Sequence, residues 1–202
     1  TIIVTGASRG IGYQTALKLA ESGNCVIATA RSKDKLDELA QAAKNGNIIP
    51  VAADLTESTG IQKIAEVAEE NAPLSGIVNN AGAVHRGPFM DTDMETWRHL
   101  MDVNLFAIVR LLQASKNLLD KGSHVVNISS MSGYQGSLKF GGLAAYGAAK
   151  AAVIGLSEVL SAEFSNDGIS VNCLAIGAVQ TDMLAEAFRG FEAPVCPEQI
   201  GG

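Results

Sequence analysis

The sequence has no hydrophobic run long enough to cross a membrane. Its 202 residues contain no apolar stretch approaching the ~18 residues that a bilayer requires, and no basic segment followed by a cleavable apolar segment opens the chain. No repeat, low-complexity tract or interdomain linker interrupts it either. We therefore expect a cytoplasmic protein with a single domain over residues 1–202, which is long enough to bury a sizeable core.

Clusters of basic residues and cysteine motifs are also missing. The 15 Lys and Arg residues are scattered and outnumbered by 21 Asp and Glu, for a net charge of −6. Nucleic acids and anionic membranes are bound through clustered Lys and Arg, so neither is expected as a partner. Cys25, Cys173 and Cys196 have neither C-x-x-C spacing nor a histidine at metal-ligand spacing, so we expect no metal site and no disulfide.

Short apolar runs alternate with stretches of helical periodicity along the whole chain. Parallel strands need crossover connections and bury both faces, so this alternation predicts an α/β fold: a doubly wound, Rossmann-like parallel sheet with helices on both faces. Such a sheet binds its ligand beyond the carboxyl ends of its strands. The expected strands are residues 1–5, 25–30, 48–53, 76–80, 124–130 and 169–176. The expected helices are residues 11–23, 33–44, 58–71, 94–119 and 145–164.

A glycine turn follows the first expected strand. Gly6, Gly10 and Gly12 let the backbone pass close to a pyrophosphate, and the helix that begins near Ile11 offers free N–H groups and a positive dipole end. The spacing is G-x-x-x-G-x-G, which differs from the common G-x-G-x-x-G pattern. An ordinary glycine turn is the alternative, but the position after the first strand favours a nucleotide cradle.

Tyr146 and Lys150 lie four residues apart at the start of a long alanine-rich helical run. Four residues is about one helical turn, so both side chains point the same way. A cation held nearby can lower the pKa of a phenol by ~1–3 units, which would make a usable proton donor or base. The alternative is an unreactive pair on a solvated helix face.

Several further segments occur in a characteristic order: Thr5 to Gly12 in the glycine turn, Asp54-Leu55, Asn79 to Gly82, Asn104, Ser129-Ser130, and Tyr146 with Lys150. Together they resemble the classical short-chain dehydrogenase/reductase family, and the resemblance covers essentially the whole chain. It implies an oxidoreductase that takes a small-molecule substrate and assembles as a homodimer or homotetramer.

The resemblance also implies roles for individual residues. Tyr146 would be the acid/base, and Lys150 would lower its pKa and bind the nicotinamide ribose. Ser130 would stabilise the developing oxyanion, Asn104 would hold a water linking Lys150 to solvent, and Asp54 would recognise the adenine amino group. The remaining cofactor residues that we expect are Gly6, Ser8, Arg9, Gly10, Ile11, Gly12, Arg31, Leu55, Asn80, Ala81, Gly82, Gly177 and Thr181.

The sequence departs from the family pattern in three places. The usual serine spacing falls on Gly133, so Ser130 implies a loop three residues longer, with Ser132 as the alternative hydroxyl. Ile176-Gly177 stands where the family usually has Pro-Gly, which can make that loop less rigid. The C-terminal strand and helix that usually follow, and that help to build the subunit interface, are expected to be missing after the substrate loop at residues 178–196.

Charge near the second strand bears on the choice of cofactor. A free ribose diol is usually held by a carboxylate at the end of this strand, whereas a 2′-phosphate needs cations. Here the strand ends Thr29-Ala30-Arg31, and Arg9 lies in the glycine turn. The two arginines predict NADP(H) rather than NAD(H), unless both are solvated surface charges.

The leading hypothesis is an NADPH-dependent reductase of a ketone or aldehyde. We expect its pocket to be formed by residues 84–89, 131–142 and 178–191, and the apolar side chains Met183, Leu184, Phe188 and Phe191 favour an apolar substrate. One alternative is a reductase of 3-oxoacyl chains on an acidic carrier protein, although residues 165–168 are acidic rather than basic. Another is a catalytically silent NADP-binding regulatory protein on the same fold.

Overall fold

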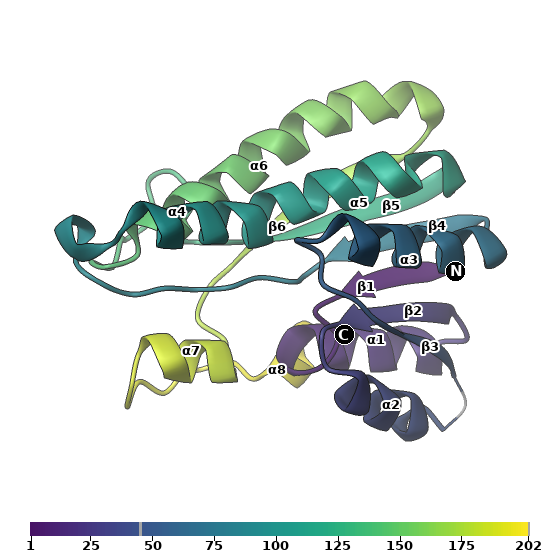
Figure 1. Cartoon of the computed structure of the whole chain (residues 1–202), viewed down its shortest axis with the longest axis horizontal. Helices are drawn as coiled ribbons and strands as arrows, with labels where there is room; N and C mark the ends of the chain where they lie inside the picture. Colours follow the sequence, from purple (N-terminus) through teal and green to yellow (C-terminus); the bar gives the residue numbers. More distant parts are fainter. Residues whose placement is uncertain (45, 202) are drawn as a thin grey trace.

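A computed structural model describes residues 1–44 and 46–201 and contains a six-stranded parallel sheet in the order β3-β2-β1-β4-β5-β6. Every neighbouring pair is parallel, which confirms the predicted doubly wound, Rossmann-like sheet (Figure 1). The strands are β1 (Ile2–Thr5), β2 (Cys25–Ala30), β3 (Asn47–Ala52), β4 (Leu74–Asn79), β5 (Leu119–Ser130) and β6 (Ser170–Ile176). The main helices are α1 (Gly10–Glu21), α2 (Lys33–Ala42), α3 (Ser58–Glu70), α4 (Met94–Met101), α5 (Ala107–Ser115), α6 (Ala144–Phe164), α7 (Asp182–Ala187) and α8 (Pro197–Ile200).

The stretch predicted to be helical over residues 94–119 is helical from Met94 to Leu118, but it is not one uniform α-helix. A π-helical turn (Asp102–Phe106) separates α4 from α5, and a 3₁₀ turn (Lys116–Leu118) ends the segment before Leu119 enters β5. The apolar periodicity continues through the π turn, so sequence pattern alone does not reveal a locally wider helix.

Strand β5 begins five residues before its predicted start at His124. Leu119 pairs with Leu74, and pairing then resumes at His124 opposite Gly76. Between them the backbone bulges through Gly122, whose φ is +91°, and the Ser123 hydroxyl donates to the Leu74 carbonyl at 2.7 Å. The predicted strand missed this part because the bulge breaks its alternation.

Alternating side chains of the strands form two cores, one on each face of the sheet. Ile3 and Ile27 belong to the core under α3, α5 and α6, whereas Val4 and Val26 belong to the core under α1 and α2. These helices therefore hold both faces of the sheet and leave the carboxyl ends of the strands accessible.

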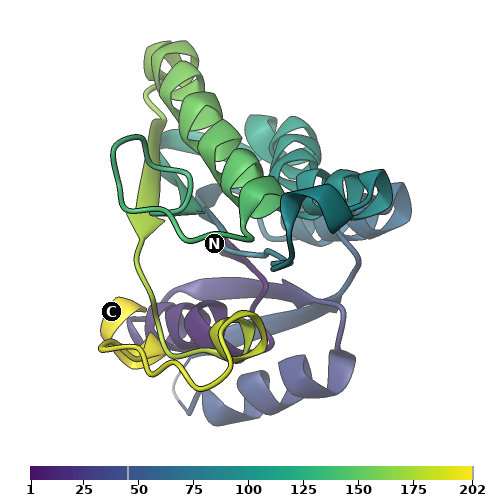
Figure 2. The same ribbon diagram turned by 90° about the vertical axis from the view of Figure 1, so that its left-hand side faces the viewer.

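The order of the strands reverses between β1 and β4, which lie side by side at the centre of the sheet. The segments that leave these two strands diverge to opposite faces, which is where an open α/β sheet forms its ligand crevice. Figure 2 shows the loops after the strands and helix α7 gathered at this edge. Within residues 1–44 and 46–201, no helix is both long enough and apolar enough to span a membrane.

Candidate active site

The glycine turn lies between β1 and α1 and depends on close packing. Gly6 has φ +67°, and a Cβ placed on it would lie 2.8 Å from Ala81 Cα. A Cβ on Gly12 would lie 2.4 Å from both the Gly6 carbonyl oxygen and Asn80 Nδ2. Gly12 therefore sets how closely α1 approaches the turn, and its expected cofactor contact stays a prediction.

Thr5, which the sequence reasoning did not assign to the site, joins the ends of β1 and β4. Its hydroxyl oxygen accepts hydrogen bonds from the backbone N–H groups of Asn80 and Ala81 at 2.9 and 3.0 Å. The Asn80 amide donates to the Thr5 carbonyl at 2.9 Å. A threonine at the last position of a strand, directly before the glycine turn, was the available signal.

A cleft of about 770 Å³ extends from the glycine turn to α6. Of the predicted residues, the cleft is lined by Gly6, Ser8, Arg9, Gly10, Ile11, Arg31, Asp54, Leu55, Asn80, Ala81, Gly82, Tyr146, Lys150 and Thr181. In the part of the chain that the structure describes, Gly12, Asn104, Ser130 and Gly177 are outside this lining. The sequence reasoning missed further lining residues, among them Lys35, Thr56, His99, Gln180, Cys196 and Glu198.

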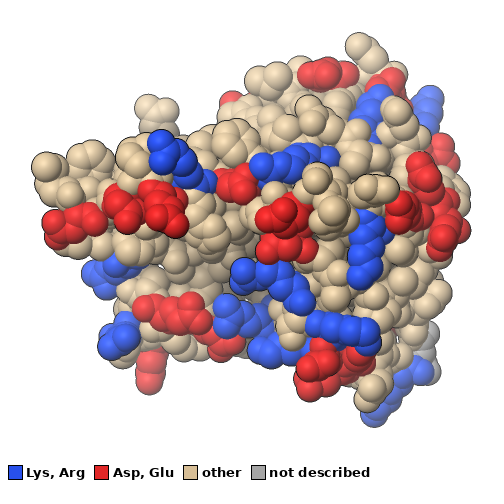
Figure 3. Space-filling model, viewed as in Figure 1, with Lys and Arg blue, Asp and Glu red and all other residues tan. Residues whose placement is uncertain are grey.

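The charge around the cleft is uneven. In the space-filling view, a group of basic side chains borders the hollow between the upper and lower parts of this face (Figure 3). Arg9, Arg31 and Lys35 line the cleft. Lys35 lies four residues after Arg31, in the first turn of α2. This spacing was the available signal that Lys35 lies beside Arg31 in the cleft. The end of the cleft beside the glycine turn and β2 is suited to anionic groups.

Asp54 brings a single carboxylate into the same end of the cleft. Its Oδ1 accepts hydrogen bonds from the Thr56 backbone N–H at 2.9 Å and from the Thr56 hydroxyl at 2.7 Å. These bonds are the main cause that lowers the pKa of Asp54, and Arg31 lowers it further. The carboxylate is thus an ionised hydrogen-bond acceptor, as recognition of an amino group requires.

Helix α6 places Tyr146 and Lys150 together at the other end of the cleft. Lys150 is buried, donates from Nζ to the Ile128 carbonyl at 2.9 Å, and lies 5.8 Å from the centre of the Tyr146 ring. The Ser129 hydroxyl donates to the Lys150 carbonyl at 2.7 Å, which ties the helix to the end of β5. Burial lowers the pKa of Lys150 to about 8.

The expected effect of Lys150 on Tyr146 is wrong for this structure. The pKa of Tyr146 is raised, because burial favours the neutral phenol more than hydrogen bonding with Ser130 favours the phenolate. The Lys150 ammonium is directed to the Ile128 carbonyl and makes no comparable contribution. The phenol is therefore protonated at neutral pH, as a phenol of ordinary pKa also is.

The structure distinguishes between the two candidate serines. Hydrogen bonding of Ser130 with Tyr146 opposes the rise in the pKa of Tyr146, and the Ser130 Oγ accepts from the Ser132 backbone N–H at 3.1 Å. Gly133, at the family's usual serine spacing, packs against α6, where a Cβ would lie 2.4 Å from the Ala151 nitrogen. Any side chain at that position would clash, so the geometry favours Ser130 as the hydroxyl beside Tyr146.

Asn104 is fully buried in the π-helical turn. Its Nδ2 donates to the carbonyls of Ala83 and Leu100, each at 2.9 Å, and its Oδ1 accepts from the Ala83 N–H at 3.3 Å. The side chain thereby holds the segment that follows β4 against the helix. Its expected water link to Lys150 stays a prediction.

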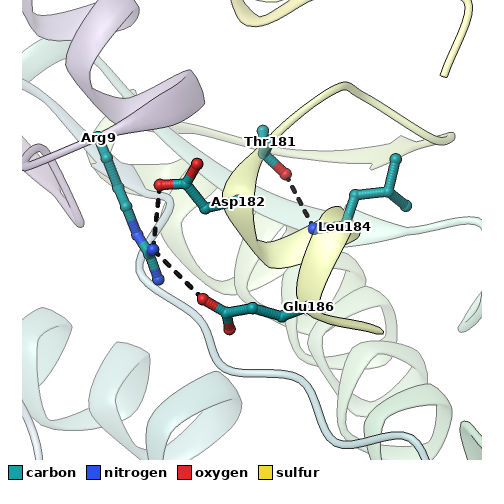
Figure 4. A network of polar contacts seen from close by, with 5 residues as sticks. All are labelled: Arg9, Thr181, Asp182, Leu184 and Glu186. Carbon is teal, nitrogen blue, oxygen red and sulfur yellow. Dashed lines mark hydrogen bonds and ion pairs between the residues drawn. The ribbon is translucent and has the colours of Figure 1, made fainter. Parts of the chain in front are cut away.

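Arg9 makes contacts that the sequence did not predict. Its guanidinium pairs with Asp182 at 3.1 Å and with Glu186 at 3.5 Å, both on α7 (Figure 4). The Thr181 hydroxyl caps α7 by accepting from the Leu184 N–H at 3.3 Å. A residue expected at the cofactor's ribose is thus connected to the loop expected at the substrate.

The three loops predicted to form the substrate pocket contact one another; we call residues 84–89, 131–142 and 178–191 the outer loops. The Arg86 guanidinium lies 4.3 Å from the centre of the Phe188 ring and donates to the Ala187 carbonyl at 3.3 Å. Phe188 also packs edge-on against Phe140, with ring centres 5.8 Å apart. A second cleft of about 750 Å³ lies between these loops.

The match to known families agrees with this geometry. A sequence model described as short chain dehydrogenase matches residues 1–191. The chain belongs to the short-chain dehydrogenase/reductase family of oxidoreductases, whose members bind NAD(P).

Individual relatives are similar along most of this chain. It is 31% identical over 202 residues to the NADPH-dependent 1-acyldihydroxyacetone phosphate reductase of Schizosaccharomyces pombe, covering 98% of this chain and 66% of that protein. It is 34% identical over 187 residues to the 3-oxoacyl-[acyl-carrier-protein] reductase of Synechocystis, covering 90% and 74%. The probable oxidoreductase EphD of Mycobacterium tuberculosis is 33% identical over 206 residues, and the chain spans 34% of its length.

Solved structures superpose on nearly the whole chain. A short chain dehydrogenase from Burkholderia cenocepacia, in complex with NADP, is 27% identical with a TM-score of 0.89, covering 99% of this chain and 86% of that one. A short-chain dehydrogenase from Streptomyces avermitilis is 31% identical with a TM-score of 0.86, covering 99% and 80%.

Proposed function

We propose that this protein is an NADP(H)-dependent reductase of ketones or aldehydes. The observation that carries the proposal is one cleft with a glycine turn, Asp54 and basic side chains at one end and Tyr146 with Lys150 at the other. Gly6 approaches Ala81 so closely that a Cβ would not fit, and Arg31 and Lys35 line the wall near the turn. These residues fit a dinucleotide that carries an additional phosphate.

The chemistry assigned to the chain follows from the protonated state of Tyr146. A bound nicotinamide supplies or accepts a hydride. The Tyr146 phenol, whose pKa burial raises above the ordinary value of 10.0, is protonated at neutral pH, so it can donate its proton to the oxygen of a carbonyl substrate. The Ser130 hydroxyl donates a hydrogen bond to the same oxygen as negative charge develops there. Lys150 contributes a positive charge and binds the ribose.

The choice of NADP(H) is supported by Arg31 and Lys35, and by a relative and a solved structure whose names include NADPH or NADP. Replacing Arg31 with Asp puts a negative charge where the 2′-phosphate is proposed to bind. We expect NADPH affinity to fall about ten-fold or more and NADH affinity to change little, because a charge-assisted contact contributes ~1.5–3 kcal/mol. Lys33→Asp, at an ammonium that pairs with Asp37 at 2.6 Å, is the matched control. Equal loss of both cofactors would refute the assignment.

The apolar residues of the outer loops, among them Met183 in the lining of the first cleft, support a small apolar carbonyl compound as substrate. A panel of aliphatic and aromatic ketones and aldehydes, with NADPH oxidation followed by absorbance, tests this directly. We expect turnover to increase with apolar size until the pocket is filled. NADPH binding without turnover of any member would instead support the silent regulatory alternative.

A reductase of carrier-bound acyl chains is the second candidate, because one relative is a 3-oxoacyl-[acyl-carrier-protein] reductase. An acidic carrier requires a basic docking surface, whereas Asp167 in the acidic segment 165–168 already pairs with Lys116 at 2.5 Å. We expect a free 3-oxoacyl thioester to react at least as fast as its carrier-bound form, measured side by side. A strong preference for the carrier would reverse this choice.

Assembly as a homodimer or homotetramer and a cytoplasmic location complete the proposal. Both come from the family resemblance and from the composition of the chain. Light scattering of the purified protein and fractionation of the source cells test them.

A further inference from the structure

Two acidic side chains hold the arginine of the glycine turn. Arg9 lies directly before α1, and Asp182 and Glu186 lie four residues apart on α7, so both carboxylates face the same guanidinium. The dashed lines of Figure 4 show both ion pairs meeting at Arg9. Asp182 lines the cleft that extends from the glycine turn to α6, and Glu186 lines the cleft between the outer loops, so α7 borders both clefts and Arg9 joins it to the glycine turn.

This arrangement conflicts with the task proposed for Arg9. A guanidinium that binds a 2′-phosphate has fewer donors left for two carboxylates, and it must release Asp182 and Glu186 before it can reach the phosphate. NAD(H) carries a hydroxyl at the same position and meets neither difficulty. The acidic residues therefore compete with only one of the two cofactors.

We infer that Asp182 and Glu186 are specificity-determining residues that weaken NADP(H) binding by occupying Arg9, and that the 2′-phosphate loosens α7 in return. The inference rests on the proposed use of NADP(H). Arg31 and Lys35 line the same cleft and remain for the phosphate, so the acidic pair moderates the preference for NADP(H) without reversing it. Since coupling between two sites is reciprocal, the cofactor that takes Arg9 must also weaken the hold of Arg9 on α7.

The test measures dissociation constants of NADPH and NADH by calorimetry for the wild type and for the double variant Asp182→Asn/Glu186→Gln. All three side chains are about half exposed or more, so the effect is that of surface ion pairs. We expect NADPH to bind about 2- to 10-fold more tightly to the double variant and NADH to bind as before. Glu192→Gln removes one charge from the same segment at a residue that pairs with no cation among residues 1–44 and 46–201, and should change neither.

An Arg9→Gln background separates competition for Arg9 from simple repulsion through space. There the double substitution should leave NADPH affinity unchanged, because the acidic residues act through the guanidinium. A persistent gain in that background, or equal gains for NADPH and NADH in the wild-type background, would overturn the inference. The wild-type ratio of NADPH to NADH affinity tests the proposed cofactor separately, so either idea can fail without the other being misjudged.

The reciprocal effect is measured by trypsin cleavage after Arg189, which is exposed directly beyond α7. At saturating cofactor, cleavage should be faster with NADPH than with NADH, and this difference should disappear in Asp182→Asn/Glu186→Gln. Equal rates with both cofactors in the wild type would show that α7 is not coupled to the phosphate.

Discussion

The two ends of the binding region are held by different kinds of contact. The inner end is the whole cleft from the glycine turn to α6; there Lys150 is 4% exposed, and its ammonium and carbonyl are hydrogen-bonded to β5. The outer end consists of the outer loops, which include α7. Its contacts are made by exposed residues: the side chains of Asp182 and Glu186, for example, are each 66% exposed. The inner end is part of the core of the sheet, whereas the outer end is assembled on its surface.

This contrast indicates which property each end controls. Buried polar groups interact strongly and are costly to leave unpaired, so changes at the inner end should affect the rate and the stability of the fold. Exposed ion pairs and cation–π contacts contribute little each. Changes at the outer end should therefore alter selectivity by small factors and leave the fold intact.

Removing the Tyr146 hydroxyl should have the largest effect. We expect Tyr146→Phe to lower turnover by ~10²–10⁴, the usual contribution of a positioned proton donor, with NADPH binding nearly unchanged. Tyr13→Phe is the matched control and should keep full activity. Tyr13 lies on α1 and packs against the core on the face of the sheet opposite to α6. Full activity of Tyr146→Phe would show that the inner end is only structural.

Lys150 should make stability depend on pH. Its pKa is about 8 in the folded chain against an ordinary value of 10.5. Below pH ~8 Lys150 is charged in both the folded and the unfolded chain, and the folded chain bears the full cost of burying that charge. Between pH ~8 and ~10.5 Lys150 keeps its proton only in the unfolded chain, so the free energy of unfolding rises with pH. Relative to Lys150→Met, the wild type should gain on the order of 3 kcal/mol across this window, measured by urea unfolding. If the difference in unfolding free energy between the wild type and Lys150→Met does not change with pH, the Lys150 ammonium is not desolvated.

Glycine positions provide a test of the packing at the inner end. In Gly12→Ala the new methyl group would lie 2.4 Å from the Gly6 carbonyl, so we expect a loss of ~1–3 kcal/mol in unfolding free energy and weaker binding of both cofactors. Gly155→Ala is the control, since a Cβ there would meet no described atom within 4 Å on an exposed face of α6. It should stabilise the protein by ~0.5–1 kcal/mol.

The inner end was also the part that the sequence predicted well. Strand-end residues such as Asp54, Asn80 and Gly6 are placed by the backbone of a doubly wound sheet, so the order of strands and turns is sufficient to bring them together. Two details at this end differed from expectation for physical reasons. The direction of the Tyr146 pKa depends on burial, and the π turn at Asn104 leaves the apolar periodicity unchanged.

The outer end could not be predicted in the same way. The pairing of Arg9 with α7 joins residues more than 170 positions apart through exposed side chains, and no periodicity in the sequence carries that information. The sequence did identify which segments form the outer loops, because they follow strands β4, β5 and β6. It gave no sign that Arg86 lies on Phe188, since such contacts depend on how flexible loops meet.

The Arg86 contact provides the smallest and most selective test. Arg86→Met removes the cation–π contact with Phe188 and the hydrogen bond to the Ala187 carbonyl but keeps an apolar side chain. An exposed contact of this kind contributes ~0.5–1 kcal/mol, so we expect KM for the most active ketone of the panel to rise about 2- to 5-fold, with kcat and NADPH affinity unchanged. Arg189→Met removes the same charge from the same cleft and is the control. If both variants raise KM equally, charge rather than loop contact governs the outer end, and a fall in kcat would show that the two ends are coupled.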